Sequence, residues 1–272
     1  MRNLDGARLS MLCCGAIPLD PAHFRADLNP MSQSTLDPAE IAKFSALAAQ
    51  WWNPKGPFGA LHRLNPVRLG FIRETAMRHF ATASRQPLAG LKALDLGCGG
   101  GLVSAPLARM GAALTAIDAS AEAIGAARAY AEQAGLTIDF QCTTAEALVE
   151  QGAQFDLVTA LEIIEHVADV PAFLSAAQAL VRPGGLLILS TINRTPKARA
   201  LAIVGAERIL KWAPDGAHDY DKLVTPEEIR AGAGAISWDE PAGIIYNPLG
   251  DGWSISSDID VNYMIAGVRR SA

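Results

Sequence analysis

Residues 91–101 read Leu-Lys-Ala-Leu-Asp-Leu-Gly-Cys-Gly-Gly-Gly, an apolar run that leads through Asp95 directly into a glycine cluster. Such a run is typical of a buried parallel strand that ends in a tight turn and opens a helix. In an open parallel sheet, ligands bind beyond the carboxyl ends of the strands, and glycines let the backbone approach them closely. The stretch therefore predicts a small-molecule site at the end of a central strand.

The glycine spacing and two acidic residues indicate which ligand binds there. A dinucleotide-binding turn requires G-x-G-x-x-G, whereas Gly97, Gly99 and Gly101 are spaced G-x-G-x-G and are followed by a leucine. Asp95 brings negative charge to the strand end, which disfavours a pyrophosphate and favours a cationic ligand. Asp118 ends the next predicted strand, about 20 residues after Gly97, which is the spacing at which an acid meets a ribose diol. The pattern predicts S-adenosylmethionine, and the alternative is a glycine-rich turn with an incidental acid.

Composition narrows the class of protein. The chain has 272 residues, 50% of them hydrophobic, which is enough for a sizeable core. A net charge of −5 and the lack of a nucleic-acid-binding motif exclude DNA and RNA as expected partners. Four cysteines without metal-site spacing favour a reducing, cytoplasmic location. Cys98 could be a nucleophile, but a small residue that fills a tight turn explains it as well.

An alternation of strand and helix patterns follows residue 91 and predicts a doubly wound α/β sheet. The expected strands are 92–96, 113–117, 136–141, 155–161 and 186–191, with helices at 101–110, 120–134 and 170–181 and a last strand near 261–268. We expect one domain over 36–268 after a disordered leader at 1–35. Its parts are a helical lid (36–90), a cofactor-binding core (91–193), a helical insertion (194–230) and carboxy-terminal strands (240–268).

The predicted lid begins with Asp37-Pro38-Ala39-Glu40, a helix opening of the capping-box type. This helix ends at Trp51-Trp52, and a second helix reaches about Phe80. The tryptophan pair fits a lid over the cofactor site and core packing equally well.

Glu162, Glu165 and His166 lie just beyond the fourth predicted strand, at positions i, i+3 and i+4. On a helix, this spacing points the three side chains the same way. Two carboxylates and an imidazole suit a hard divalent ion that holds a catechol-type oxygen pair. The alternative is a solvated first helical turn, in which case His166 is the best candidate for a general base.

Several motifs together resemble the class I S-adenosylmethionine-dependent methyltransferases, namely Asp95-x-Gly-x-Gly-x-Gly, Asp118, Phe155-Asp156-Leu157-Val158 and Leu180-Val181-Arg182-Pro183-Gly184-Gly185. Further motifs outside the cofactor fold are similar to those of the ubiquinone-biosynthesis O-methyltransferases. These are Ala42-Lys43-Phe44, Trp51-Trp52, residues 61–68, Glu162-x-x-Glu165-His166-Val167, Ser190-Thr191-x-Asn193-Arg194, residues 204–207, Tyr246-Asn247-Pro248 and residues 260–264.

The resemblance implies a Rossmann-like, mostly parallel seven-stranded sheet and the two O-methylation steps on polyprenyl phenol and quinol intermediates of ubiquinone. It implies cofactor contacts at Arg68, Gly97, Asp118 and Leu161, to which the residue pattern adds Asp95 and Gly99. It also implies magnesium at Glu162, Glu165 and His166, and other ubiquinone-biosynthesis proteins as partners. The alternatives are a different small-molecule methyltransferase and a non-catalytic scaffold that retains the fold.

Residues 194–212 form a basic, apolar segment, with five Lys or Arg side chains against Glu207. Because a polyprenyl substrate must be presented from a bilayer, the segment predicts peripheral attachment to an anionic membrane surface at its inner face. No apolar run is long enough to span a bilayer. The alternative is an amphipathic helix that closes over the substrate pocket.

Overall fold

The computed structural model describes residues 35–201, 219–247 and 252–271. Ser34–Ala272 form one unit of the chain, and the description below concerns that unit. The predicted leader, apart from Thr35, and residues 202–212 of the predicted membrane segment lie outside the described residues.

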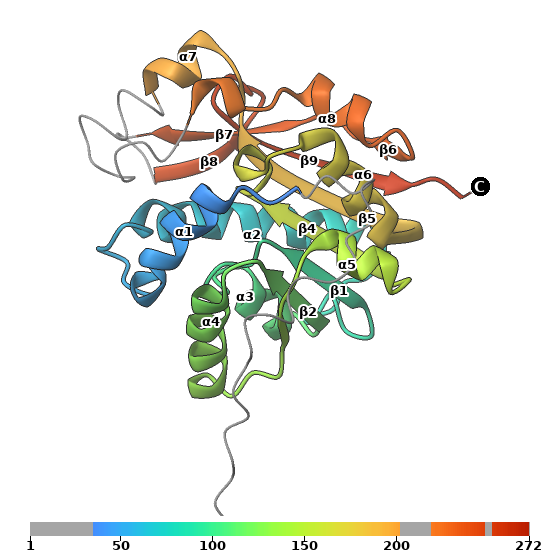
Figure 1. Ribbon diagram of the computed structural model, residues 1–272. Coiled ribbons are helices and arrows are strands. Elements are labelled where there is room, and N and C mark those ends of the chain that lie inside the picture. The colour runs from blue at the N-terminus through green and yellow to red at the C-terminus, as the bar shows by residue number, and fades with distance from the viewer. Residues whose placement is uncertain (1–34, 202–218, 248–251, 272) are drawn as a thin grey trace, which may run out of the picture. The chain divides into compact units, whose positions relative to one another are not determined.

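A mixed sheet runs through the unit and is nine-stranded within the described ranges. Its order is β3-β2-β1-β4-β5-β9-β7-β8, with β6 paired to β9. The first five strands are β1 (Lys92–Leu96), β2 (Ala113–Asp118), β3 (Asp139–Cys142), β4 (Phe155–Leu161) and β5 (Val181–Ile192). The others are β6 (Ile236–Trp238), β7 (Ala242–Asn247), β8 (Gly252–Ser256) and β9 (Asn262–Arg269). Strands β1 to β5 pair in parallel, whereas β9 runs antiparallel to β5 (Figure 1).

Helices cover both faces of this sheet. The amino-terminal helices are α1 (Pro38–Ala46), η2 (Ala48–Gln50) and α2 (Gly59–His79). Those between the parallel strands are α3 (Ser104–Arg109), α4 (Ala121–Gln133), α5 (Ala145–Glu150), η3 (Ile164–His166) and α6 (Val170–Leu180). After β5 come α7 (Pro196–Ala198), η5 (Tyr220–Lys222) and α8 (Pro226–Gly232). Within the described residues, no helix is both long and apolar enough to cross a bilayer.

The central strands are buried on both faces, which explains why they read as continuous apolar runs. In β4, Leu157 packs into a core with α2 and α3, while its neighbour Val158 packs into a second core with α6 and α8. In β5, Ile188 and Leu189 divide between the same two cores. Side chains alternate along a strand, so a strand covered on both sides needs apolar residues at successive positions.

The predicted doubly wound α/β class is confirmed, and most predicted elements lie within a few residues of the observed ones. Three details differ. The described sheet has two strands more than the expected seven, because β8 and the short β6 extend it. The helix expected from residue 101 begins at Ser104, because the glycine turn continues for another three residues. Strand β5 begins at Val181 and not at 186, with a register irregularity opposite Phe155 and Leu157.

Candidate functional site

The glycine cluster forms a tight turn between β1 and α3. Gly97 and Gly99 have backbone φ values of +68° and +51°, a left-handed region that side chains disfavour. A Cβ atom on Gly97 would lie 2.6 Å from Cγ1 of Ile163, and one on Gly99 would collide with the indole of Trp51. The turn is therefore closely covered from two sides, and it lies at the point where the strand order reverses between β1 and β4.

Asp118 ends β2 beside this turn. Its Oδ2 accepts a hydrogen bond from the backbone N–H of Gly99 at 2.8 Å, and its Oδ1 accepts one from Ser120 N–H at 2.8 Å. Burial raises the pKa of Asp118 above its usual value, while these two amides oppose the rise. The carboxylate is thus held at the turn with a defined direction.

Asp95 lies near the end of β1, immediately before the glycine turn. The side chain is buried at 2% exposure, and it accepts hydrogen bonds from Ser104 Oγ at 2.6 Å and Thr159 Oγ1 at 2.9 Å. Burial raises its pKa to about 6, although Ser104, Thr159 and Arg68 all favour the ionised form. Asp95 is therefore a buried acid at the end of β1 that is held by side chains of α3 and β4.

A pocket joins the glycine turn to the region of the Glu-x-x-Glu-His motif. Five parts of the chain line it: the turn after β1, the end of β2, the loop before α5, the segment around η3, and α1 with the loop that follows it. The lining residues used below are Glu40, Phe44, Trp51, Gly97, Gly99, Asp118, Glu162 and His166. Glu165, Arg68, Leu161 and Asp95 are not among the residues that line it.

The expected helical turn over Glu162, Glu165 and His166 is wrong. Glu162 has a φ of +53°, and only Ile164–His166 form a short 3-10 turn, so the spacing does not bring the three side chains together. Each one contacts a different neighbour. Ser190 Oγ donates to Glu162 Oε1 at 2.6 Å, Thr191 Oγ1 donates to Glu165 Oε2 at 2.9 Å, and His166 Nδ1 lies 3.0 Å from Glu40 Oε2.

These contacts bear on the expected magnesium site. In the described ranges, no group of three or more His, Cys, Asp or Glu side chains is arranged to hold a metal ion. Glu165 is only 3% exposed and lies away from the pocket lining. The donor set that the sequence suggested is therefore divided between separate contacts, and it does not fit a shared ion in this arrangement.

Arg68 and Leu161 are both buried and do not line the pocket. Arg68 is 2% exposed, donates to Asn65 Oδ1 at 3.1 Å, and its Nη1 lies 3.8 Å from Glu162 Oε1. Its Nε is buried and has no hydrogen-bond partner among the described residues. Leu161 ends β4 and packs in the core that α2 shares.

Both tryptophans contact the glycine turn and stack on other aromatic side chains. Trp51 stacks on Phe58 with ring centroids 3.7 Å apart and covers the glycine turn. Trp52 donates its indole N–H to the carbonyl of Gly100 at 2.8 Å and stacks on Tyr130 of α4. Cys98 in the same turn is buried, and burial raises the pKa of its thiol well above the ordinary value, which makes it a poor nucleophile.

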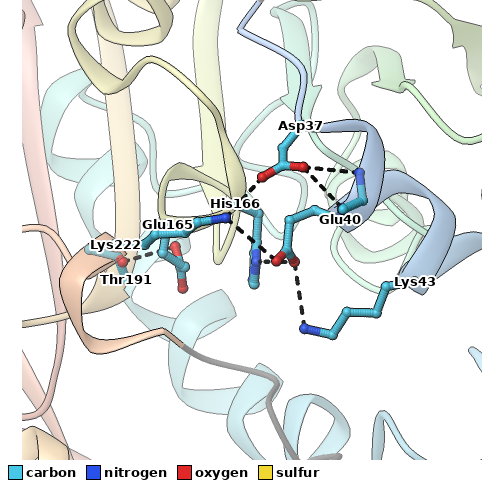
Figure 2. A network of polar contacts seen from close by, with 8 residues as sticks. Asp37, Glu40, Lys43, Glu165, His166, Thr191 and Lys222 are labelled. Atoms are coloured by element: carbon cyan, nitrogen blue, oxygen red, sulfur yellow. Dashed lines mark hydrogen bonds and ion pairs between the residues drawn. The ribbon is translucent and has the colours of Figure 1, made fainter.

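Glu40 lines the pocket and does not form the capping box that the sequence predicts. Its position three residues after Asp37 suggested a capping box, and Asp37 does cap α1 by accepting from Ala39 N–H at 3.0 Å. The Glu40 carboxylate, however, contacts His166, Lys43 and Lys222 (Figure 2). By contrast, Thr225 and Glu228 do form a capping box at the start of α8.

Residues 94–189 match the family described as a methyltransferase domain. The fold is shared with magnesium protoporphyrin IX methyltransferase from Synechocystis PCC 6803, solved with bound SAH, at a TM-score of 0.58 and 20% identity, over 84% of this chain and 94% of that one. The strand order, the glycine turn and the acid at the end of β2 define a class I S-adenosylmethionine-dependent methyltransferase.

Two relatives identify the family more closely. The ubiquinone biosynthesis O-methyltransferase of Azorhizobium caulinodans is 50% identical over 240 residues, which cover 87% of this chain and 95% of that protein. The protein of the same name from Parvibaculum lavamentivorans is 50% identical over 242 residues, covering 88% and 96%. The chain belongs to the ubiquinone biosynthesis O-methyltransferase family.

Proposed function

We propose that this chain transfers the methyl group of S-adenosylmethionine to a phenolic oxygen of polyprenyl intermediates in ubiquinone biosynthesis, at both O-methylation steps. The observation that supports this most directly is the single pocket lined by Gly97, Gly99 and Asp118 on one side and by His166 and Glu162 on the other. A methyl donor bound at the turn and an acceptor bound near His166 would share one cavity. Reactants held in such a cavity gain much of the rate that orientation can provide.

The cofactor is assigned to the turn. The Gly97 and Gly99 backbone would approach it closely, and Asp118 would accept hydrogen bonds from the ribose hydroxyls with the lone pairs that Gly99 and Ser120 leave available. Asp95 contributes negative charge from beneath the turn, which suits a ligand with an ammonium and a sulfonium. Arg68 and Leu161 do not line the pocket, so their contacts with the cofactor stay predictions from the resemblance.

The chemical step is an in-line displacement. The acceptor oxygen forms a bond to the methyl carbon while the bond from that carbon to sulfur breaks, so the sulfonium leaves as a neutral thioether. His166 takes the phenolic proton, a role that contributes about 10² to 10⁴ in rate. Glu162 is held by Ser190 and Arg68 at the same pocket, where its carboxylate can hold a second ring hydroxyl.

The experiment is to incubate the purified chain with isotope-labelled S-adenosylmethionine and a panel of short-chain catechols and demethylated quinols, with product detection by mass spectrometry. Methyl transfer to the catechol or quinol oxygen is expected. Rings whose hydroxyls are already methylated serve as the matched control. Transfer only to nitrogen or carbon acceptors would assign a different small-molecule methyltransferase. Failure to bind the cofactor would assign a scaffold.

Magnesium belongs to the proposal only as a prediction from the resemblance. Glu162, Glu165 and His166 would have to leave the partners described above in order to meet at one ion, so the step above is written without it. The test is turnover after removal of divalent ions with a chelator and after magnesium is added back. Loss and recovery of turnover would require that rearrangement, while full activity in excess chelator would leave His166 as the base.

Peripheral attachment to an anionic membrane is the other finer proposal. Its basic segment is described only up to residue 201, where Arg194 pairs with Glu228 and Lys197 with Asp258. These ion pairs reduce the charge available for lipids, so attachment would depend on Arg199, whose guanidinium lies over the Tyr220 ring, and on Arg208 and Lys211, which lie outside the described residues. Flotation with anionic vesicles should retain the chain at low salt and lose it after charge reversal of Arg208 and Lys211. Equal recovery on neutral and anionic vesicles would favour a helix that closes over the substrate pocket. Binding to other ubiquinone-biosynthesis proteins stays a prediction from the resemblance.

A further inference from the structure

The carboxylate of Glu40 approaches the proposed base from a distant part of the chain. Its Oε2 lies 3.0 Å from Nδ1 of His166, and the two residues are 126 positions apart. Both side chains are largely shielded, with exposures of 19% for Glu40 and 10% for His166. A charge-assisted hydrogen bond with this geometry and partial burial is among the stronger polar contacts in proteins.

A second contact from the same helix restrains the plane of the imidazole. Phe44 lies one helical turn after Glu40, so both side chains project from one face of α1. The Phe44 ring meets the His166 ring edge-on, with centroids 4.9 Å apart and an interplanar angle of 79°. Glu40 therefore fixes the direction of Nδ1, and Phe44 limits rotation of the ring.

Glu40 is itself held in place by its surroundings. Its Oε1 lies 3.7 Å from Nζ of Lys222, and Lys222 also binds Asp37 Oδ2 at 2.9 Å (Figure 2). Asp37 caps the first turn of α1, so the helix that carries Glu40 is docked at its amino-terminal end. Lys222 thus docks the amino-terminal end of α1, while the direct contact between Glu40 and His166 does not involve it.

We propose that Glu40 is the positioning residue that sets the ring orientation and tautomer of His166 for reaction with the acceptor substrate. When Nδ1–H donates to Glu40, chemistry toward the pocket must run through Nε2 as the acceptor nitrogen. A base whose second nitrogen is oriented by a carboxylate is a recurring arrangement in enzymes, and carboxylates that orient a metal-bound histidine in the same way typically contribute 10- to 100-fold. The inference deepens the proposed function and rests on it for the catalytic consequence.

The first test compares Glu40→Ala and Glu40→Gln with the wild type and with Lys222→Met. Lys222→Met removes the ion pairs that dock α1 but leaves the contact between Glu40 and His166. We expect kcat to fall about 10- to 100-fold in Glu40→Ala and by an intermediate amount in Glu40→Gln, with the dissociation constant for S-adenosylmethionine unchanged. Lys222→Met should retain kcat within about threefold. An equal loss of kcat in Lys222→Met would assign the effect to helix docking and overturn the proposal.

The second test does not require turnover, so it separates failure of this inference from failure of the proposed function. Nitrogen NMR of the imidazole reports which ring nitrogen carries the proton, and His166→Gln identifies the signal among the 5 histidines. At a pH where the ring is neutral, the wild type should show the proton on Nδ1. Glu40→Ala should move the proton toward Nε2, the tautomer that an unconstrained imidazole prefers in water. The same tautomer in both proteins would overturn the proposal.

Discussion

The two halves of the pocket are built in different ways. The half that we assign to the cofactor comes from one strand, the turn that follows it and the end of the neighbouring strand, where Asp118 is held by the backbone N–H groups of Gly99 and Ser120. The half that we assign to the acceptor is lined by side chains of α1 and of the segment around η3, and its contact between Glu40 and His166 joins residues 126 positions apart. The cofactor half therefore follows from local backbone geometry, while the acceptor half exists only when distant elements are packed.

The largest expected effect comes from replacing His166, the proposed base, because this change should affect the reaction but not cofactor binding. His166→Gln should lower kcat by about 10² to 10⁴, because the phenolic proton loses its acceptor, while cofactor affinity stays within about twofold. Steady-state kinetics and cofactor titration measure the two quantities. His79→Gln is a matched control, since His79 contacts the carbonyl of Gly184 and not the pocket. A parallel loss of cofactor affinity would contradict the division into halves.

The next prediction concerns the free energy that it costs to ionise the buried Asp95 in the folded protein. The folded pKa of Asp95 is about 6, above the ordinary value of 3.8, so the folded state holds this proton more tightly than the unfolded state. The free energy of unfolding should therefore fall as pH rises from about 4 to about 6.5, by up to about 3 kcal/mol, and then level off. Below about pH 4 both states are protonated and the cost disappears.

Asp95→Asn removes this ionisation and is the variant with which to measure it. Urea unfolding of both proteins between pH 4 and pH 8 should show a stability difference that grows in favour of the variant across the same range. The variant should bind S-adenosylmethionine more weakly, because the cationic ligand loses a nearby charge. A stability difference that does not change with pH would show that ionisation of Asp95 does not lower the free energy of unfolding.

A third prediction sharpens the assignment of the ribose. Asp118→Ala should weaken cofactor binding roughly 10- to 100-fold, since hydrogen bonds to a charged group contribute about 1.5 to 3 kcal/mol. At saturating cofactor, kcat should recover most of its value, which is the reverse of the result expected for His166→Gln. Calorimetry on the folded variant gives the constant, and an unchanged value would exclude Asp118 from the ribose contact.

The smallest expected effect tests the contact through which the amino-terminal segment covers the turn. Trp52→Phe keeps an aromatic ring that can stack on Tyr130 but removes the indole hydrogen bond to the carbonyl of Gly100. The free energy of unfolding should fall by about 1 kcal/mol, as for a typical hydrogen bond. Trp52→Leu removes the stacking as well and should cost more. Equal losses in the two variants would show that the hydrogen bond contributes little.

This contrast also explains how far the sequence could predict the structure. The strand 155–161 and the glycine turn were readable because each depends on local periodicity and on backbone conformations that glycine permits. The position of Asp118 followed from its spacing along the same unit. By contrast, the Glu-x-x-Glu-His spacing predicts a helix, and no residue near Glu162 in the sequence indicates its left-handed backbone.

Glu40 is a second case in which a local motif did not predict the side-chain contact. Its distance from Asp37 matched a capping box, and the same spacing at Thr225 and Glu228 does form one. The difference arises because His166 and Lys222 offer Glu40 partners that only the packed fold brings close. A side chain can leave the local contact that its motif predicts when the fold brings a charged group or an imidazole close to it.

The left-handed backbone at Glu162 has a consequence for the evolution and engineering of this enzyme. A side chain in this conformation costs about 1 to 2 kcal/mol, and Glu162→Gly would relieve that cost, partly offset by the greater freedom of glycine in the unfolded chain. The same change would take a carboxylate out of the pocket. Glycine would also leave the buried Arg68 guanidinium without the carboxylate that lies 3.8 Å from its Nη1, a loss that costs about 3 to 5 kcal/mol and exceeds the relieved strain. Thermostable variants should therefore retain Glu162 in spite of its left-handed backbone.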